Sequence, residues 1–361
     1  MAAADRAAPR AAWLRAAIAV YLTIRVSALG FTLVLPLVGA ASVAENPGFA
    51  RMGGLLLVAL SFHVFAYVLN DVVDLWLDRS EPLRADSPLV QGAVGCGKLI
   101  ALAWVQLPIA FGLAWALGAH RAALAMLGLA FAAMALYDGY GKRCRWPLLT
   151  DAVQSIGWCA LVGVGAWWDA PVPAPLTGWI AGYAFFCVML VQGVHGGLRD
   201  LANDQRGGAR TTAIWLGARP AVGTGIVLSR SMVAYAVLLQ AALWVTGLGA
   251  LAVAAASLRL AEPEPLLGWV GGVSALLAAA TVALVLAYRR RAARHRLIAA
   301  GAWNIVATLF VLPALVVPAL GAVEAGVLLG ALALPIVAML VYNGSHWRLA
   351  PQPQPQAAVK A

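Results

Sequence analysis

The chain has 361 residues, of which 63% are hydrophobic and only 11% are charged, and its mean hydropathy is +0.85. A soluble globular domain carries about 25% charged residues, so this composition excludes that class and predicts a protein embedded in a membrane. The net charge is +10 at pH 7. Nucleic-acid binding needs a soluble basic face, and a chain this apolar provides none, so we expect no nucleic-acid partner.

Apolar runs recur along the whole chain, and many approach the roughly 20 residues that cross a bilayer as a helix. We therefore predict an all-α fold, a polytopic transmembrane helical bundle of about nine to ten spans. Some of these apolar runs are short, and one is long enough to contain a break in its helix. The ten candidate spans are Ala16–Ala40, Met52–Leu69, Leu99–Leu117, Ala122–Leu136, Leu148–Trp168, Trp179–Val194, Val222–Leu248, Leu266–Tyr288, Leu297–Leu320 and Ala325–Tyr342.

The basic residues predict the orientation of these spans. If the N-terminus is cytoplasmic and the spans alternate, 20 of the 25 Lys and Arg residues fall on the inner side, and only Arg51, Arg121 and Arg259 fall outside. This asymmetry is the positive-inside pattern. It predicts a multi-pass protein, most simply of a bacterial cell membrane, with its functional residues facing the cytoplasm and its inner surface against membrane lipid.

The two ends of the chain differ from the middle. Residues 1–15 form a basic, Ala-rich segment without the pattern of a cleaved signal peptide. Residues 346–361 are rich in Pro and Gln, a composition typical of disorder. We expect one membrane domain over residues 16–345, and no second soluble domain.

Two acidic clusters, in residues 70–78 and 199–206, hold five of the chain's 15 Asp and Glu residues. Each cluster lies at the end of an apolar span. A carboxylate there costs free energy, so its default interpretation is a functional one. Helical spacing would place the acidic side chains of each cluster on one face, where they repel one another unless a cation lies between them. Mg²⁺ takes oxygen ligands and bridges carboxylates to phosphates. The candidate metal ligands are Asp71, Asp74, Asp78, Asp200 and Asp204, flanked by the neutral oxygens of Asn70 and Asn203.

Other polar residues near these clusters have simpler interpretations. Three aspartates are most simply helix caps or solvated charges: Asp86, Asp138 and Asp151. Two histidines are most simply hydrogen-bonded packing residues: His63 and His195. Arg25, in the first span, either extends its charge to the headgroups or contacts an anion. The inner loop 137–143 carries cations that could neutralise a diphosphate.

The paired clusters resemble the motifs of the UbiA superfamily of intramembrane prenyltransferases, over roughly residues 16–320. The first family motif, N-D-x-x-D-x-x-x-D, is matched by Asn70, Asp71, Asp74 and Asp78. The basic loop that follows it in the family is matched by Pro82, Arg84, Pro88, Leu89 and Gly92. The second motif and the run after it are matched by Asp200, Asp204, Gly208, Thr211, Leu216 and Gly217.

The chain departs from the family pattern in two places. The family often shows Y-x-x-x-K at the end of the fourth span, whereas here Tyr137 stands five residues before Lys142. Family members usually have nine spans, and we count ten. Arg25 occupies a position where the family often carries an arginine near the acceptor.

The resemblance implies an Mg²⁺-dependent transfer of a prenyl group from an isoprenyl diphosphate to a small acceptor, most often an aromatic ring. It implies that one Mg²⁺ is held by Asp71, Asp74 and Asp78, and a second by Asp200 and Asp204. Both metal ions would stabilise the charge on the departing diphosphate. The residues that would bind the substrates are Arg25, Asn70, Tyr137, Tyr140, Lys142, Arg143, Arg199 and Asn203.

Three alternatives stay open at this point. A UbiA-type terpene cyclase would use the same diphosphate site and no acceptor. A phosphoribosyl transferase to a lipid phosphate shares the architecture. A cation- or proton-coupled transporter would also place carboxylates in a membrane, but transporters commonly bind near the bilayer midplane, whereas these aspartates lie at the ends of spans on one side.

Overall fold

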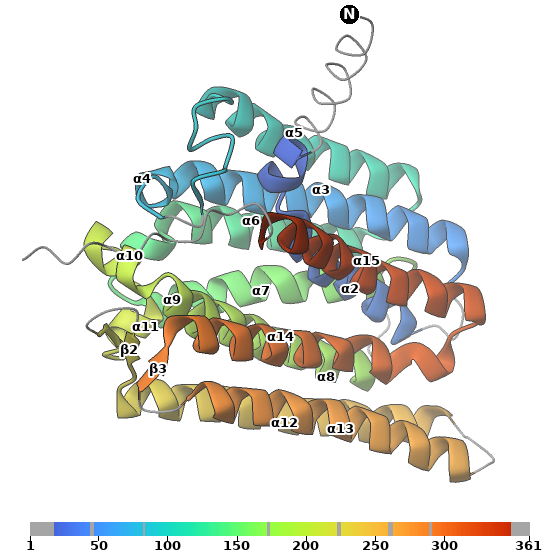
Figure 1. Cartoon of the computed structure of the whole chain (residues 1–361). Helices are drawn as coiled ribbons and strands as arrows, with labels where there is room; N and C mark the ends of the chain where they lie inside the picture. Colours follow the sequence, from blue (N-terminus) through green and yellow to red (C-terminus); the bar gives the residue numbers. More distant parts are fainter. Residues whose placement is uncertain are drawn as a thin grey trace, which may run out of the picture.

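The computed structural model describes residues 18–43, 47–81, 84–171, 174–221, 225–258, 263–288 and 291–347. Long helices run side by side through the molecule (Figure 1). Within the described residues, eight helices are long and apolar enough to cross a membrane, and two shorter apolar helices, 26–41 and 322–338, accompany them. This arrangement confirms the predicted polytopic helical bundle and is consistent with its nine to ten spans.

The long helices are α2 (Val26–Ala41), α3 (Phe49–Val73), α5 (Cys96–Ala116), α6 (Arg121–Tyr140), α7 (Pro147–Ala166), α8 (Pro175–Leu190), α12 (Arg230–Leu258), α13 (Pro263–Ala287), α14 (Arg294–Val316) and α15 (Ala322–Trp347). Proline begins α7 and α8, where its fixed φ suits the first turn and its missing N–H costs nothing. His120 caps α6, since its Nδ1 accepts a hydrogen bond from the Ala122 amide.

Helices α2 and α7 pack closely through glycines. A Cβ at Gly39 would collide with the backbone of Val162, and one at Gly165 with the backbone of Pro36. Small residues at helix interfaces in membranes allow such close backbone approach, because dispersion contacts rather than the hydrophobic effect drive association there. The α2–α7 pair is therefore a rigid part of the bundle, next to the helices that carry the first acidic cluster.

The short elements gather at one end of the bundle (Figure 1). They are α4 (Leu75–Asp78), η2 (Gly141–Arg143), η3 (Val191–Gly196), α9 (Gly197–Arg199), α10 (Leu201–Gly207), α11 (Thr212–Trp215) and the strands β1 (Arg219–Pro220), β2 (Gly225–Val227) and β3 (Arg291–Ala293); η4 (Val317–Ala319) follows α14. The strands form a small antiparallel sheet in the order β1-β2-β3. Both acidic clusters thus lie at this end, as predicted.

Each acidic cluster contains a break that the sequence did not predict. Helix α3 ends at Val73, and Asp74 joins it to α4 with φ −86° and ψ 1°. Asp200 joins α9 to α10 with nearly the same angles, φ −96° and ψ 1°. This sparsely populated region of backbone conformation is common in active-site residues. The helix is therefore kinked at Asp74 and Asp200, but i→i−4 hydrogen bonds still cross both positions, from Asp78 N to Asp74 O at 3.0 Å and from Asp204 N to Asp200 O at 2.9 Å.

Two span boundaries also differ from the prediction. Residues 18–23 are helical, the chain turns at 24 and 25, and α2 begins only at Val26. The seventh span was expected from Val222, but β2 occupies residues 225–227 and α12 begins at Arg230. The basic segment 1–15 and residues 348–361 of the expected tail lie outside the described residues, whereas 346 and 347 belong to α15.

A buried polar network joins the C-terminal helices to the end of α8. His195 Nε2 lies 2.7 Å from Asn304 Oδ1, and Asn304 Nδ2 donates to Gln240 Oε1 at 3.1 Å and to the Ala280 carbonyl at 2.6 Å. Asn304 is completely buried. This bonding confirms His195 as a packing residue, and it ties η3, α12, α13 and α14 together just before the second acidic cluster.

Candidate active site

One cavity at the polar end brings both acidic clusters together. Four of the five predicted aspartates line it: Asp74, Asp78, Asp200 and Asp204. Five of the other predicted site residues also line it: Arg25, Asn70, Tyr137, Lys142 and Arg199. The structure therefore assembles most of the predicted site from α3, α4, α6, η2, α9 and α10.

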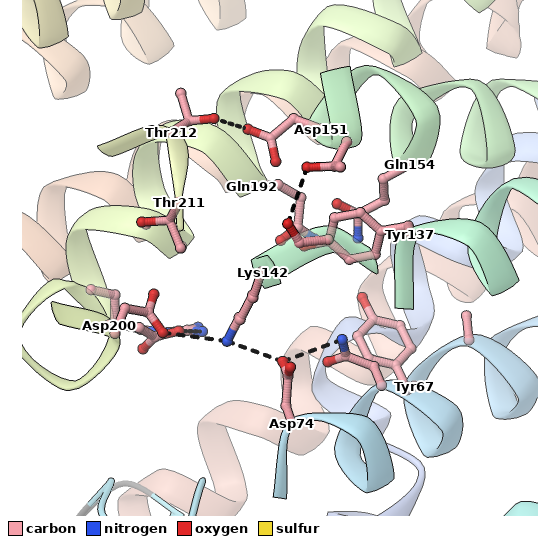
Figure 2. Close-up of a pocket in the computed structure, with 18 of the residues that line it drawn as sticks. Tyr67, Asp74, Tyr137, Lys142, Asp151, Gln154, Gln192, Asp200, Thr211 and Thr212 are labelled. Carbon is pink, nitrogen blue, oxygen red and sulfur yellow. Dashed lines mark hydrogen bonds and ion pairs between the residues drawn. The ribbon is translucent and has the colours of Figure 1, made fainter. Parts of the chain in front are cut away.

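Lys142 lies between the two acidic clusters. Its Nζ is 3.0 Å from Asp74 Oδ2 and 3.4 Å from Asp204 Oδ1, so a single ammonium group bridges one carboxylate from each cluster (Figure 2). Helix η2 continues directly from the end of α6 and carries this lysine into the cavity. The point between the clusters is therefore a site for positive charge.

The first cluster is surrounded by two arginines. Arg25 forms an ion pair with Asp71 and lies 5.3 Å above the ring centre of Tyr67. Arg84, from the loop after the motif, lies 3.8 Å from Asp71 and 3.7 Å from Asp78. Burial raises the pKa of Asp78, and the charge of Arg84 opposes that rise. Burial also lowers the pKa of Arg84.

The second cluster has its own arginine. Arg199 donates two hydrogen bonds to Asp200, at 2.8 and 2.7 Å, in the bidentate geometry typical of guanidinium and carboxylate. Burial alone would raise the pKa of Asp200, but the hydrogen bonds and charge of Arg199 outweigh it, and the pKa falls below its ordinary value. Burial raises the pKa of Asp204 to about 6, against the opposing charge of Lys142.

Asn203 joins the two clusters through hydrogen bonds to other residues of the chain. Its amide donates to the Leu77 carbonyl at 3.0 Å, and its side-chain oxygen accepts a bond from the Ser80 hydroxyl at 2.8 Å. These bonds hold α10 against α4. The structure thus gives Asn203 a positioning contact, and its predicted role in substrate binding stays a prediction.

Tyr140 and Arg143 do not line this cavity. The Tyr140 side chain is 68% exposed. Arg143 is also exposed and lines a second, more open pocket with Trp76, Lys142 and Arg210. For both residues, a role in substrate binding stays a prediction.

The interpretation of Asp138 and Asp151 as caps or solvated charges was wrong, whereas Asp86 is exposed as expected. Asp138 is buried and its Oδ1 accepts a bond from Asn70 Nδ2 at 3.2 Å. Asp151 is buried, lines the cavity, and accepts a bond from the Thr212 hydroxyl at 2.5 Å. The signal that could have found Asp151 was its place one turn into an apolar span, where a carboxylate marks function by default.

His63 was correctly predicted to be a hydrogen-bonded packing residue. Its Nδ1 lies 2.7 Å from Thr32 Oγ1, and its Nε2 lies 2.7 Å from the Ile24 carbonyl oxygen. Since a carbonyl can only accept, Nε2 carries the proton and Nδ1 accepts from Thr32. His63 therefore bonds the backbone of the turn that contains Arg25.

The donor set of the cavity fits a hard divalent cation, which takes carboxylate oxygens. Among the described residues, no three His, Cys, Asp or Glu side chains are close enough together to hold a metal ion as they stand. The carboxylates are instead paired with Lys142 and with three arginines, Arg25, Arg84 and Arg199. The bridging ammonium of Lys142 shows that the geometry accepts a cation between the clusters.

The family model of the UbiA prenyltransferase family matches residues 28–264, a stretch that includes both acidic clusters and Lys142. The chain belongs to this family. It is thus an integral membrane protein of a prenyltransferase family. No curated protein matches the chain.

Solved UbiA homologues share the fold of this UbiA family member. The apo structure of a homologue from Aeropyrum pernix K1 is 19% identical and covers 80% of this chain and 96% of its own, with a TM-score of 0.55. A homologue from Archaeoglobus fulgidus bound to Cd²⁺ is 15% identical over 82% of this chain and 99% of its own, with a TM-score of 0.51. The structure of a homologue from Archaeoglobus fulgidus bound to GPP and Mg²⁺ is 16% identical and covers 81% of this chain and 98% of its own, with a TM-score of 0.50.

Proposed function

We propose that this protein transfers a prenyl group from an isoprenyl diphosphate to an aromatic acceptor, in an Mg²⁺-dependent reaction on the cytoplasmic side of the membrane. The observation that carries the proposal is the single cavity in which both acidic clusters meet around Lys142. The predicted excess of basic residues on this side supports the orientation. The binding of GPP and Mg²⁺ by the Archaeoglobus fulgidus homologue supports the donor class and the metal.

The cavity has two kinds of wall that suit an isoprenyl diphosphate. Charged residues of both clusters line one part, and the apolar side chains of Ala66, Met134 and Trp158 line another. A diphosphate is a dense anion, while its prenyl tail is hydrocarbon, so each part of the substrate would contact the wall that matches it. The surrounding helices are apolar, and such a substrate already resides in lipid.

Asp71, Asp74 and Asp78 would hold one Mg²⁺, and Asp200 and Asp204 a second. When bound, the metal supplies charge that stabilises the departing diphosphate. The chain's own cations act on the same oxygens, because Lys142, Arg84 and Arg199 can exchange their carboxylate partners for phosphate oxygens. The side chains of Lys142 and Arg84 are largely covered, at 23% and 24% exposed, so their charge acts more strongly there than in water, whereas Arg199 is 46% exposed.

The remaining task of the site is to bring the acceptor to the allylic carbon and exclude water. An aromatic ring carbon would attack that carbon as the carbon–oxygen bond to the diphosphate breaks. The Trp158 side chain is 2% exposed and helps to close the apolar wall of the cavity. A closed wall protects the allylic cation from hydrolysis.

The test is to incubate the purified protein in lipid with geranylgeranyl diphosphate and Mg²⁺, with and without a panel of aromatic acceptors. Released diphosphate and mass spectrometry of the organic phase are the readouts, and Asp204→Asn is the matched control. We expect an adduct that needs an acceptor and disappears with chelator. An acceptor-independent hydrocarbon would instead show a cyclase, and no consumption of several donors would overturn prenyl transfer.

A further inference from the structure

Asp138 is a buried carboxylate near the end of α6 that belongs to neither acidic cluster. Its side chain is only 5% exposed, and it does not line the cavity that holds the clusters. Its Oδ1 accepts a hydrogen bond from Asn70 Nδ2 at 3.2 Å, and Asn70 does line the cavity. Asp138 therefore contacts the candidate active site through Asn70.

The ends of α3 and α6 face each other in register. Both helices end at the polar end of the bundle, so they run in the same direction. Asn70 and Asp74 are four residues apart, and the Asp74 amide donates to the Asn70 carbonyl at 2.9 Å, so they share one helix face. Asp138 and Lys142 are also four residues apart, where α6 continues into η2. Asn70 bonds to Asp138, and Lys142 Nζ lies 3.0 Å from Asp74 Oδ2 (Figure 2). Two polar contacts therefore fix the end of α6 along α3.

The side-chain amide of Asn70 has one orientation that satisfies its neighbours. Its Nδ2 donates to Asp138 Oδ1 at 3.2 Å and to Asp74 Oδ2 at 3.4 Å, while its Oδ1 accepts from Arg25 Nη2 at 3.4 Å. A carboxylate only accepts hydrogen bonds, and a guanidinium only donates them. Turning the amide over would set its oxygen against two carboxylates and its nitrogen against a cation. Asp138 is thus one of the groups that fix the orientation of this amide.

Stability of the fold does not explain why Asp138 is buried. Its second oxygen, Oδ2, is buried without a hydrogen-bond partner among the described residues. An unpaired polar atom in such a place costs free energy, and an apolar side chain of similar shape removes that cost. Asn70 would still have Asp74 as an acceptor if Asp138 were replaced. A leucine at this position would therefore serve the fold at least as well.

We propose that Asp138 is a positioning residue for the end of the active site that binds the diphosphate. It holds the Asn70 amide with its nitrogen toward Asp74 and its oxygen toward Arg25. It also keeps the end of α6 at the level where Lys142 meets Asp74. Without the Asp138 carboxylate the amide can turn over, and Asp74 Oδ2 then loses one of the two donors that contact it. This inference rests on the proposed function, in which Asp74 and Lys142 act at the diphosphate.

Four variants separate positioning from packing. Asp138→Leu removes the acceptor of the Asn70 bond, whereas Asp138→Asn keeps it, because the amide oxygen can still accept. Asn70→Ala provides a background in which Asp138 has no side-chain amide to hold. Gln106→Leu is the matched control: Gln106 is buried on α5, does not line the cavity, and bonds to its own helix at Leu102.

The experiment measures, for protein in lipid with Mg²⁺, steady-state transfer, the calorimetric Kd for geranylgeranyl diphosphate and the thermal unfolding midpoint. We expect Asp138→Leu to lower kcat/KM for the donor about ten-fold, the upper end of what one hydrogen bond contributes, and to raise the donor Kd. The KM for the acceptor should stay within about two-fold, and the unfolding midpoint should not fall. Asp138→Asn should restore most of the rate, and Gln106→Leu should behave as the wild type.

A double-mutant cycle then tests whether Asp138 acts through Asn70. In the Asn70→Ala background, Asp138→Leu should cause no further loss of kcat/KM, because residues that act as one unit are not additive. Losses that multiply in full would overturn the assignment.

Two other results would also overturn it while leaving prenyl transfer intact. One is an unchanged kcat/KM and donor Kd in Asp138→Leu. The other is a lower unfolding midpoint in Asp138→Leu than in Gln106→Leu, which would make Asp138 a structural contact. Failure of the proposed function looks different, because the wild type would then form no adduct with any acceptor, and the role of Asp138 would be judged from the donor Kd.

Discussion

His63 should determine whether Arg25 reaches the active site. Arg25 has φ 48° and ψ 56°, the left-handed conformation, and within the described residues it is the only non-glycine residue with positive φ. For an L-residue this conformation costs about 1–2 kcal/mol. His63 opposes that cost, because it donates to the Ile24 carbonyl in the turn itself and accepts from Thr32 in the second turn of α2.

The change His63→Leu removes both hydrogen bonds and keeps the apolar volume of the side chain roughly filled. Hydrogen bonds between helices in membranes contribute on average about 0.6 and at most about 1.7 kcal/mol each, so the two together are worth about 1–3 kcal/mol. That sum matches the cost of the backbone conformation at Arg25. We therefore expect the turn to relax and Arg25 to leave Asp71, with kcat/KM falling about ten-fold, the equivalent of 1.4 kcal/mol.

The assay is steady-state transfer by protein in lipid, with Arg25→Ala as the reference for complete loss of the guanidinium. His63→Gln is the matched control, since its amide nitrogen can replace Nε2 as the donor to Ile24 and should restore part of the rate. A thermal unfolding midpoint measured on each variant separates a loss of positioning from a loss of fold. If His63→Leu keeps kcat/KM within two-fold while Arg25→Ala loses it, Arg25 holds its position without His63.

The remaining predictions concern the clusters and the buried network. Asp204→Asn should abolish turnover while the protein stays folded in the membrane, and wild-type activity would remove Asp204 from the metal site. Lys142→Ala should raise the KM for the diphosphate more than the KM for the acceptor; the reverse order would reassign this lysine. A chelator should stop turnover and added Mg²⁺ should restore it, whereas activity that persists in chelator would exclude the metal requirement. Asn304→Leu should lower the unfolding midpoint by the equivalent of about 2 kcal/mol, because it removes the three hydrogen bonds of Asn304, each worth about 0.6 kcal/mol. His195 and Gln240 would each lose their bond to Asn304. An unchanged midpoint would contradict this.

The sequence predicts the bundle well because a bilayer restricts spanning segments to apolar helices of nearly fixed length. It also predicts that Asp74 and Asp204 approach each other, since their spacing and their places at the ends of spans are both visible in the chain. The cations of the inner loop 137–143, Lys142 among them, are visible in the chain as well. These features depend on local pattern, and the structure brings all three residues to one cavity.

Other features depend on which helices are neighbours, and a single sequence does not show this. The burial of Asp151 and its bond to Thr212 follow from α7 packing beside α11. The turn at Arg25 is stabilised by His63, 38 positions further along the chain, so nothing in the flanking residues indicates it. The strand β2 was mistaken for the start of a span because residues 225–227 are as apolar as a helix. Hydropathy alone does not distinguish these two structures over so short a run.

The segment η3 is a π-helix within an otherwise α-helical span, and it lies immediately before the second acidic cluster. A π-helical turn contains one residue more than an α-helical turn, and such bulges occur frequently at functional sites. Each residue of an α-helix turns the chain by about 100°. Because the extra residue of η3 is contained within one turn, deleting one residue from Val191–Gly196 would restore a regular helix and leave Asp200 facing the cavity, whereas the same deletion in α8 would rotate everything after it by about 100°. The span thus holds one additional residue just before the second acidic cluster without changing the direction in which that cluster faces.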